Sequence, residues 1–187
     1  MWLTFLAVVV VSFATLIFMR PVAEKVGLID KPNFRKRHQG FIPLIGGIAL
    51  FLGTLTFYAF QANTLPLPGL YLLSMTILLI IGVLDDRFDI SPALRAGIQA
   101  ILAGAMIYSG LELESLGQII APFSIKLGFF SLIFTVFITI GVINAFNMVD
   151  GIDGLLAGLS SVSFAGIGAL MCINQGHAIA YWCLAII

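Results

Sequence analysis

The 187-residue sequence has few charged residues. They make up 10% of the chain, whereas 60% of the residues are hydrophobic and the mean hydropathy is +1.12. A soluble domain is nearer a quarter charged and half apolar. The composition therefore excludes an ordinary soluble domain and indicates a polytopic membrane protein, with the lipid bilayer as a partner. We expect no nucleic-acid partner.

Cysteine is also scarce, and common catalytic motifs are missing. Cys172 and Cys183 fall in different apolar segments without metal-ligand spacing, so we interpret them as small apolar residues of membrane helices. The sequence contains no Walker-type glycine-lysine motif, no EF-hand loop and no paired-cysteine zinc pattern. Residues 2–19 lack a basic start and a small-residue cleavage site, which indicates a retained first span rather than a signal peptide.

Long apolar runs fill most of the chain. A membrane-spanning helix needs about 20 mostly apolar residues, and prolines, Pro21 among them, mark the linkers between such runs. We predict an all-α fold, a polytopic transmembrane helical bundle of six full spans plus the start of a seventh near Ala178, in a single integral-membrane domain over residues 1–187. The six spans are residues 2–19, 42–60, 67–84, 94–111, 127–143 and 155–173.

Basic residues are concentrated on one side of the expected membrane. Eight of the nine lysines and arginines lie in the first and third linkers, and only Lys126 lies in an even-numbered linker. Because basic loops stay in the cytoplasm, we expect the odd-numbered linkers there and the N-terminus outside. Five aspartates fall on the same cytoplasmic side: Asp85, Asp86, Asp89, Asp150 and Asp153.

The first linker carries a cluster of cations: Lys31, and then Arg35, Lys36, Arg37 and His38 between Pro32 and Pro43. One interpretation is a positive-inside anchor that touches anionic lipid headgroups. The other is phosphate binding, because arginine makes fork-like contacts with phosphate oxygens and lysine adds a point charge. The residues alone leave both interpretations open.

Adjacent carboxylates, Asp85 and Asp86, mark the third linker. Such a pair is either solvated in a short charged turn or neutralised by a divalent cation. Oxygen-only ligands suit Mg²⁺, which takes its remaining ligands from water and substrate phosphates. Asp89 lies one helical turn further on, so all three carboxylates face one site if this end is helical. Ser91 and Pro92 resemble an N-cap followed by proline at the first helical position.

The fifth linker contains two polar pairs spaced by three residues, Asn144 with Asn147 and Asp150 with Asp153. This spacing places each pair on one side of a helix or of its frayed end. Together the three linkers bring cations, carboxylates and amides to one membrane face, which indicates metal-assisted phosphoryl transfer to a lipid. A membrane transporter is the non-enzyme alternative, but its acids are expected near the bilayer midplane.

Residues 30–47, 82–91 and 144–155 together resemble the polyprenyl-phosphate N-acetylhexosamine-1-phosphate transferase family. The resemblance extends over essentially the whole chain, and the run R-K-R-H-Q-G at 35–40 is similar to the branch that uses GlcNAc. It implies transfer of GlcNAc-1-phosphate from UDP-GlcNAc to undecaprenyl phosphate in a bacterial inner membrane, with release of UMP. In Gram-negative relatives this is the first lipid-linked step of O-antigen and enterobacterial common antigen synthesis.

The resemblance also implies roles for the carboxylates of the third linker. Asp85 and Asp86 match an aspartate pair assigned to Mg²⁺ binding, to activation of the lipid phosphate, or to both, which makes them metal and catalytic residues. Asp89 completes that motif as a substrate-binding residue. We expect Mg²⁺ as the cofactor, with Mn²⁺ as an alternative.

In the fifth linker, Asn147 matches an asparagine placed near the metal and the diphosphate, with Asn144 supporting it. Asp150 and Asp153 match acids linked to catalysis and to holding the uridine nucleotide. We assign the cationic cluster of the first linker to substrate binding as well.

The family resemblance implies a longer protein than this chain. Later cytoplasmic loops of the family carry a Met-Gly-Asp run with another metal-binding aspartate and a histidine-rich motif, and neither occurs in these 187 residues. We therefore expect the chain to be the N-terminal portion of a longer transferase and to be inactive alone. An assembly role for an inactive fragment is the remaining alternative.

Overall fold

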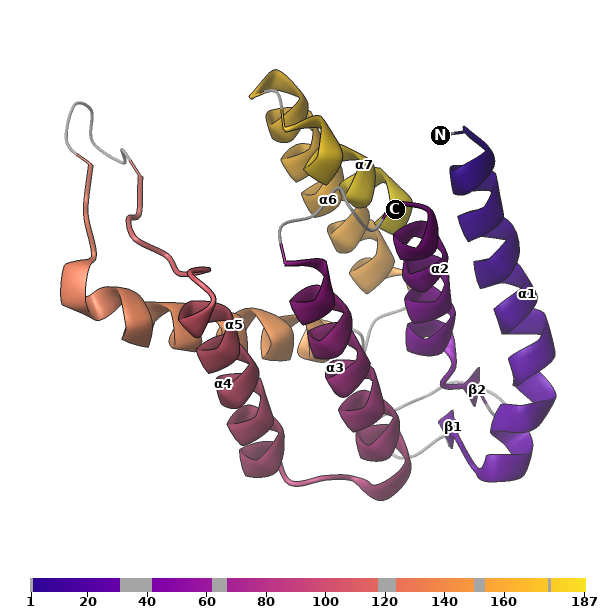
Figure 1. Cartoon of the computed structure of the whole chain (residues 1–187). Helices are drawn as coiled ribbons and strands as arrows, with labels where there is room; N and C mark the ends of the chain where they lie inside the picture. Colours follow the sequence, from indigo (N-terminus) through magenta and orange to yellow (C-terminus); the bar gives the residue numbers. More distant parts are fainter. Residues whose placement is uncertain (1, 31–41, 62–66, 118–123, 150–153, 175) are drawn as a thin grey trace. The chain divides into compact units, whose positions relative to one another are not determined.

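The computed structural model describes residues 2–30, 42–61, 67–117, 124–149, 154–174 and 176–187. Most of these residues lie in α-helices (Figure 1), whose bounds are α1 Trp2–Val26, α2 Gly46–Gln61, α3 Pro68–Phe88, α4 Pro92–Tyr108, α5 Ser131–Val149, α6 Leu155–Ile173 and α7 His177–Ile186. Each predicted span overlaps one of these helices, and the predicted start of a seventh overlaps α7. The helical character expected from the sequence is confirmed.

Only some of the described helices are long and apolar enough to cross a membrane. They are α1, α3, α6 and the segment Gly128–Val149, which includes α5. The apolar helices α2 and α7 are shorter, and α4 has 17 residues. The exact number of six full spans therefore stays a prediction, whereas an apolar, helical membrane protein is supported.

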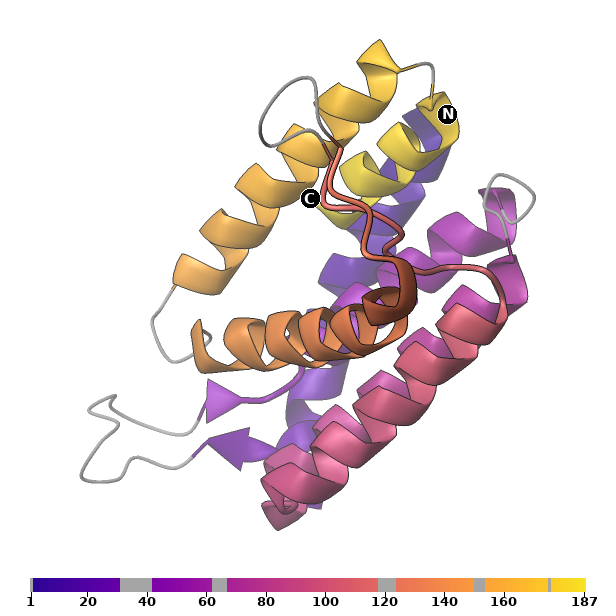
Figure 2. The ribbon, with the colours of Figure 1, turned by 90° about the vertical axis from the view of Figure 1, so that its left-hand side faces the viewer.

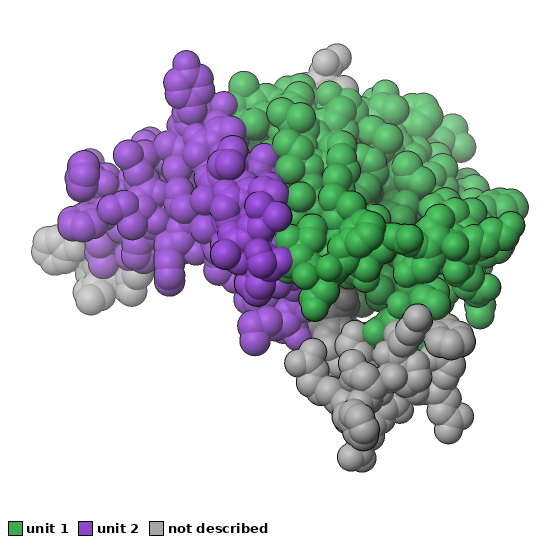
Figure 3. Space-filling model, turned by 90° about the horizontal axis from the view of Figure 1, so that it is seen from below, with its two compact units in different colours: residues 1–90, 157–187 green, residues 91–156 purple. Residues whose placement is uncertain are grey.

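The chain divides into two compact units, coloured separately in Figure 3. The first unit contains residues 1–90 and 157–187, and the second contains residues 91–156. The first unit thus holds α1, α2, α3, α7 and nearly all of α6. The second holds α4, α5 and the linker between them.

α1 continues past the predicted boundary at Met19 to Val26, with Pro21 inside the helix. The prediction that Pro21 lies in a linker is therefore wrong. Proline has no N–H to bond the carbonyl four residues earlier, but the helix resumes beyond it. Charges favour this extension, because Arg20 and Glu24 pair at 3.8 Å one turn apart, and Lys25 lies in the last turn, where helix carbonyls attract a cation.

In the first unit, α1 and α2 pack closely through small residues. Gly53 is buried, and a Cβ built on it would overlap the hydroxyl of Ser12. That hydroxyl donates a hydrogen bond to the Ala49 carbonyl at 3.3 Å. Small residues allow two helix backbones to approach without a hydrophobic driving force from water, as helix pairs in lipid require.

The first linker begins and ends in a short antiparallel pair, β1 Ile29–Asp30 and β2 Ile42–Pro43 (Figure 2). The register places Ile29 opposite Pro43. The all-α prediction missed these strands, because two residues are too few for an alternating pattern to appear in the sequence. The pair holds the two ends of the first linker side by side.

In the second unit, α4 begins as the sequence predicted. The Ser91 hydroxyl accepts a hydrogen bond from the Leu94 N–H at 3.4 Å, and Pro92 is the first helical residue. Gln99 and Leu102 lie on the buried side of this helix. The expected N-cap is confirmed, and α4 begins within the predicted third linker.

The linker from α4 to α5 folds back on itself and contacts the start of α5. Ser115 and Lys126 form an antiparallel bridge within it, and the 3-10 helix η2 Gly128–Phe130 precedes α5. The hydroxyl of Ser131, the first residue of α5, donates to the Glu112 carboxylate at 3.0 Å. These contacts hold the linker against the N-terminal end of α5. The asparagines lie at the other, C-terminal end of α5.

Candidate functional site

The aspartate pair lies on the last turn of α3. The helix extends to Phe88, so that both Asp85 and Asp86 are helical. Asp85 is half-buried and Asp86 is exposed. Successive residues of an α-helix are rotated by about 100°, so the two carboxylates leave the helix in different directions.

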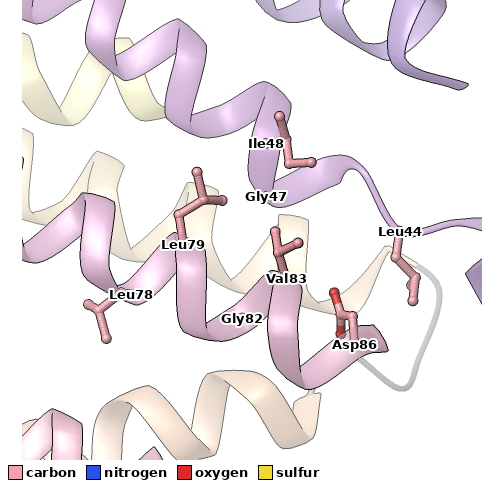
Figure 4. Close-up of a pocket in the computed structure, with 8 residues that line it drawn as sticks. All are labelled: Leu44, Gly47, Ile48, Leu78, Leu79, Gly82, Val83 and Asp86. Carbon is pink, nitrogen blue, oxygen red and sulfur yellow. The ribbon is translucent and has the colours of Figure 1, made fainter. Parts of the chain in front are cut away.

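Asp86 points to one end of an apolar hollow between the start of α2 and α3 (Figure 4). The hollow has a volume of about 170 Å³, and apolar side chains such as Ile48, Leu79 and Val83 line it. Asp85 is not among its lining residues. The hollow therefore distinguishes the two carboxylates. Asp86 lines it at one end, and Asp85 does not.

Asp89 lies directly after the last residue of α3, the helix that carries Asp85 and Asp86. Its backbone is left-handed, with φ 52° and ψ 63°, and its N–H donates to the Asp85 carbonyl at 2.8 Å as the C-cap of α3. We predicted that the three carboxylates face one site if Asp89 is helical. Asp89 is not helical, so that argument does not apply to it. A left-handed residue at this position is usually glycine or asparagine, and aspartate is among the few others that tolerate it.

The asparagines of the fifth linker lie on α5, which extends to Val149. Asn144 is half-buried and Asn147 is exposed. The side-chain Nδ2 of Asn144 donates to Gln99 Oε1 on α4 at 2.8 Å and to the Ile140 carbonyl at 2.8 Å. Asn144 is thus held by the neighbouring helix, whereas Asn147 is open at the end of α5.

Gln99 is a residue whose importance sequence reasoning missed. It is the buried polar partner of Asn144, with 6% of its surface exposed. A single amide in an apolar helix gives only a weak signal. The available hint was that Gln99 follows Arg95 by one helical turn near the start of α4, at the same end as the aspartates.

Several predicted site residues lie outside the described part of the chain: Lys31, Arg35, Lys36, Arg37, His38, Asp150 and Asp153. The aspartates of α3 belong to the first unit and the asparagines of α5 to the second. That the three linkers form one site therefore stays a prediction.

The carboxylates that the structure describes could hold a magnesium ion only together with other ligands. Within the described ranges, no group of three or more histidine, cysteine, aspartate or glutamate side chains is gathered. Mg²⁺ in phosphate-transfer sites takes one or two carboxylates and completes its shell with water and substrate phosphates. A single aspartate of the pair, with phosphate oxygens, satisfies that requirement.

Comparison with known proteins identifies a family and several relatives. The profile of glycosyl transferase family 4 matches residues 69–187. The chain is 59% identical over 177 residues to an undecaprenyl-phosphate alpha-N-acetylglucosaminyl 1-phosphate transferase of Haemophilus influenzae, covering 94% of this chain and 50% of the relative. It is 51% identical over 173 residues to the protein of that name in Escherichia coli K12, covering 92% and 47%. The chain spans about half the length of these relatives. No solved structure matches it.

Proposed function

Because this chain belongs to glycosyl transferase family 4, we propose that its full-length protein transfers GlcNAc-1-phosphate from UDP-GlcNAc to undecaprenyl phosphate. The products are GlcNAc-diphospho-undecaprenyl and UMP. The observation that carries the proposal is the 59% identity, over nearly the whole chain, to a relative named as an undecaprenyl-phosphate GlcNAc-1-phosphate transferase. The apolar helices support a lipid acceptor, since it would have to reach the site from the bilayer.

The proposed reaction is one phosphoryl substitution. An oxygen of the lipid phosphate bonds to the β-phosphorus of UDP-GlcNAc, and the bond from that phosphorus to the bridging oxygen breaks, so that UMP leaves with the electron pair. The attacking phosphate is already ionised near neutral pH. The chain therefore needs residues that position and neutralise phosphates more than it needs a strong base.

The described residues have distinct places in this proposal. Asp86, at the end of the apolar hollow, would face the region where a lipid phosphate meets its hydrocarbon chain. Asp85 or Asp86 would hold Mg²⁺, and Mn²⁺ has the same oxygen preference. The ion, when bound, would neutralise charge on the donor diphosphate. Asn147 would lie at the edge of the donor site, because it is exposed on the last turn of α5.

The remaining assignments concern the first and fifth linkers. We assign the cationic residues 31–38 to the substrate phosphates, and Asp150 and Asp153 to the nucleotide and to catalysis. The distribution of basic residues supports an inner-membrane protein with the site in the cytoplasm and the N-terminus in the periplasm. The lipid-linked product would begin O-antigen or enterobacterial common antigen synthesis.

The test is transfer of radiolabelled GlcNAc-1-phosphate from UDP-GlcNAc to undecaprenyl phosphate by the purified full-length protein. We expect a labelled lipid and an equal amount of UMP, with activity abolished by EDTA and restored by Mg²⁺. A lipid product without radiolabel would refute the proposal.

Two variants test the assigned residues. Asp86→Asn should abolish transfer and also weaken Mn²⁺ binding in the presence of UDP-GlcNAc, measured by electron paramagnetic resonance. Unchanged Mn²⁺ binding would remove Asp86 from the metal site. For the first linker, full activity of the double variant Arg37→Ala/His38→Ala would favour the anchor interpretation over phosphate binding.

A further inference from the structure

The hydrogen bonds of Asn144 fix which way its amide points. The Ile140 carbonyl can only accept a hydrogen bond, so the atom beside it must be Nδ2. The same nitrogen donates to Gln99, which must then present Oε1 rather than its own amide nitrogen. One backbone carbonyl thus determines the orientation of both side-chain amides.

This arrangement uses both hydrogens of the Asn144 amide. Each hydrogen is directed to an oxygen at 2.8 Å, one on α4 and one on α5. The remaining polar atom of the side chain is Oδ1, which can accept a hydrogen bond or coordinate a cation but cannot donate. Asn144 in this state is therefore unsuited to bind a phosphate oxygen, which requires a donor.

Gln99 is placed to maintain that state. It is 6% exposed and lies beside the buried residues Leu102 and Ala103 on α4. Removing an acceptor from such an environment leaves the partner's hydrogen without a bond, which costs more than the bond itself contributes. Without Gln99, the Asn144 side chain would be free to rotate toward water or a ligand.

We propose that Gln99 is a positioning residue that acts through Asn144, holding its amide so that only the Oδ1 acceptor is offered to a bound substrate or cation. The inference rests on the proposed transferase function. It gives Asn144, which the family resemblance implied only as a support for Asn147, the role of an acceptor for an electropositive group. That group is either an N–H or O–H of the sugar nucleotide or a divalent cation.

The experiment uses the full-length protein with Gln99→Leu and Gln99→Met, which remove the acceptor, and Gln99→Glu, which keeps an acceptor oxygen. We expect the apolar variants to raise, by roughly 10-fold, either KM for UDP-GlcNAc at saturating Mg²⁺ or the Mg²⁺ concentration for half-maximal rate. The first result identifies a hydrogen-bond donor as the ligand, and the second a cation. KM for undecaprenyl phosphate should stay unchanged, and Gln99→Glu should restore the wild-type values.

Leu102→Ala is the matched control for packing. It removes a buried neighbour of Gln99 on the same helix, so it should lower the melting temperature without changing either concentration dependence. Wild-type KM and Mg²⁺ dependence in both apolar variants would overturn the proposal, and so would a Gln99→Glu variant as impaired as Gln99→Leu.

A double variant tests whether Gln99 acts through Asn144. Adding Gln99→Leu to Asn144→Ala should cause no further loss, whereas multiplied losses would show independent roles and overturn the proposal. If the wild-type protein itself transfers no label from UDP-GlcNAc, the proposed function fails instead. The coupling between the two side chains would then still be measurable from the melting temperatures of the same variants.

Discussion

The guanidinium group of Arg87 lies against the backbone of Gly27. Its Nη1 atom is 3.2 Å from the position that a Cβ on Gly27 would occupy, and Gly27 has a φ of +74° directly after the last residue of α1. Carbonyls at the C-terminal end of a helix carry partial negative charge, which attracts a cation. Because Arg87 follows Asp86 on α3, this contact connects the end of α1 to the turn that carries the aspartate pair.

Gly27→Ala should destabilise the protein by about 1–2 kcal/mol, because an alanine is strained in the left-handed region and its Cβ displaces Arg87. Unfolding of the full-length protein in detergent, followed by circular dichroism, measures the change. Adding Arg87→Ala removes the displaced group but leaves the backbone strain, so the double variant separates the two contributions. Gly46→Ala is the control, since no described atom lies within 4 Å of its added Cβ. A Gly27→Ala protein as stable as Gly46→Ala would contradict the prediction.

The contact between Gly53 and Ser12 supports a prediction of rescue. Gly53→Ala should cost about 1–3 kcal/mol, because the added methyl group overlaps the Ser12 hydroxyl in a packed helix pair. Ser12→Ala removes that hydroxyl and leaves the Ser12 Cβ at 3.6 Å from the new methyl group, an ordinary contact. The double variant should therefore recover most of the melting temperature lost by Gly53→Ala. Additive losses in the double variant would show that Ser12 is not the obstacle.

Hydropathy predicted where the helices lie but not where they end. The apolar runs identified the segments of α1 to α7, because burial in lipid requires long apolar stretches. The ends were underestimated at Met19 and Leu84, where α1 continues to Val26 and α3 to Phe88. Backbone hydrogen bonding does not depend on hydropathy, so a helix can continue into charged residues at the membrane surface.

The candidate site was predicted where a local pattern was sufficient. Asp85 and Asp86 are adjacent, and Asn144 and Asn147 are spaced by one turn, so their grouping can be read along the chain. Gln99 acts only through a partner 45 residues away. Such a pairing depends on how two helices pack, and a single glutamine carries no information about the helix that it will contact.

The aromatic contact between Phe57 and Trp182 predicts that α7 depends on α2 for its packing. Phe57 is fully buried, and its ring meets the Trp182 ring edge-on, with centroids 4.8 Å apart. Phe57→Ala should cost about 3–5 kcal/mol through the cavity that it leaves, and the Trp182 emission should change because its ring loses this neighbour. Phe60→Ala, on the exposed side of α2 within the described chain, should have little effect. Unchanged emission in Phe57→Ala would place Trp182 elsewhere.

Variants of Asp89 separate its backbone role from its charge. Asparagine also tolerates the left-handed region, so Asp89→Asn should keep the end of α3 while removing the carboxylate. Asp89→Val should lower stability by about 1–2 kcal/mol, because a β-branched residue is strained there. If Asp89 serves mainly as the C-cap of α3, transferase activity should follow stability, remaining high in Asp89→Asn and Asp89→Gly and falling in Asp89→Val. A stable Asp89→Asn protein without activity would instead assign the carboxylate itself to substrate binding, as the family resemblance implies.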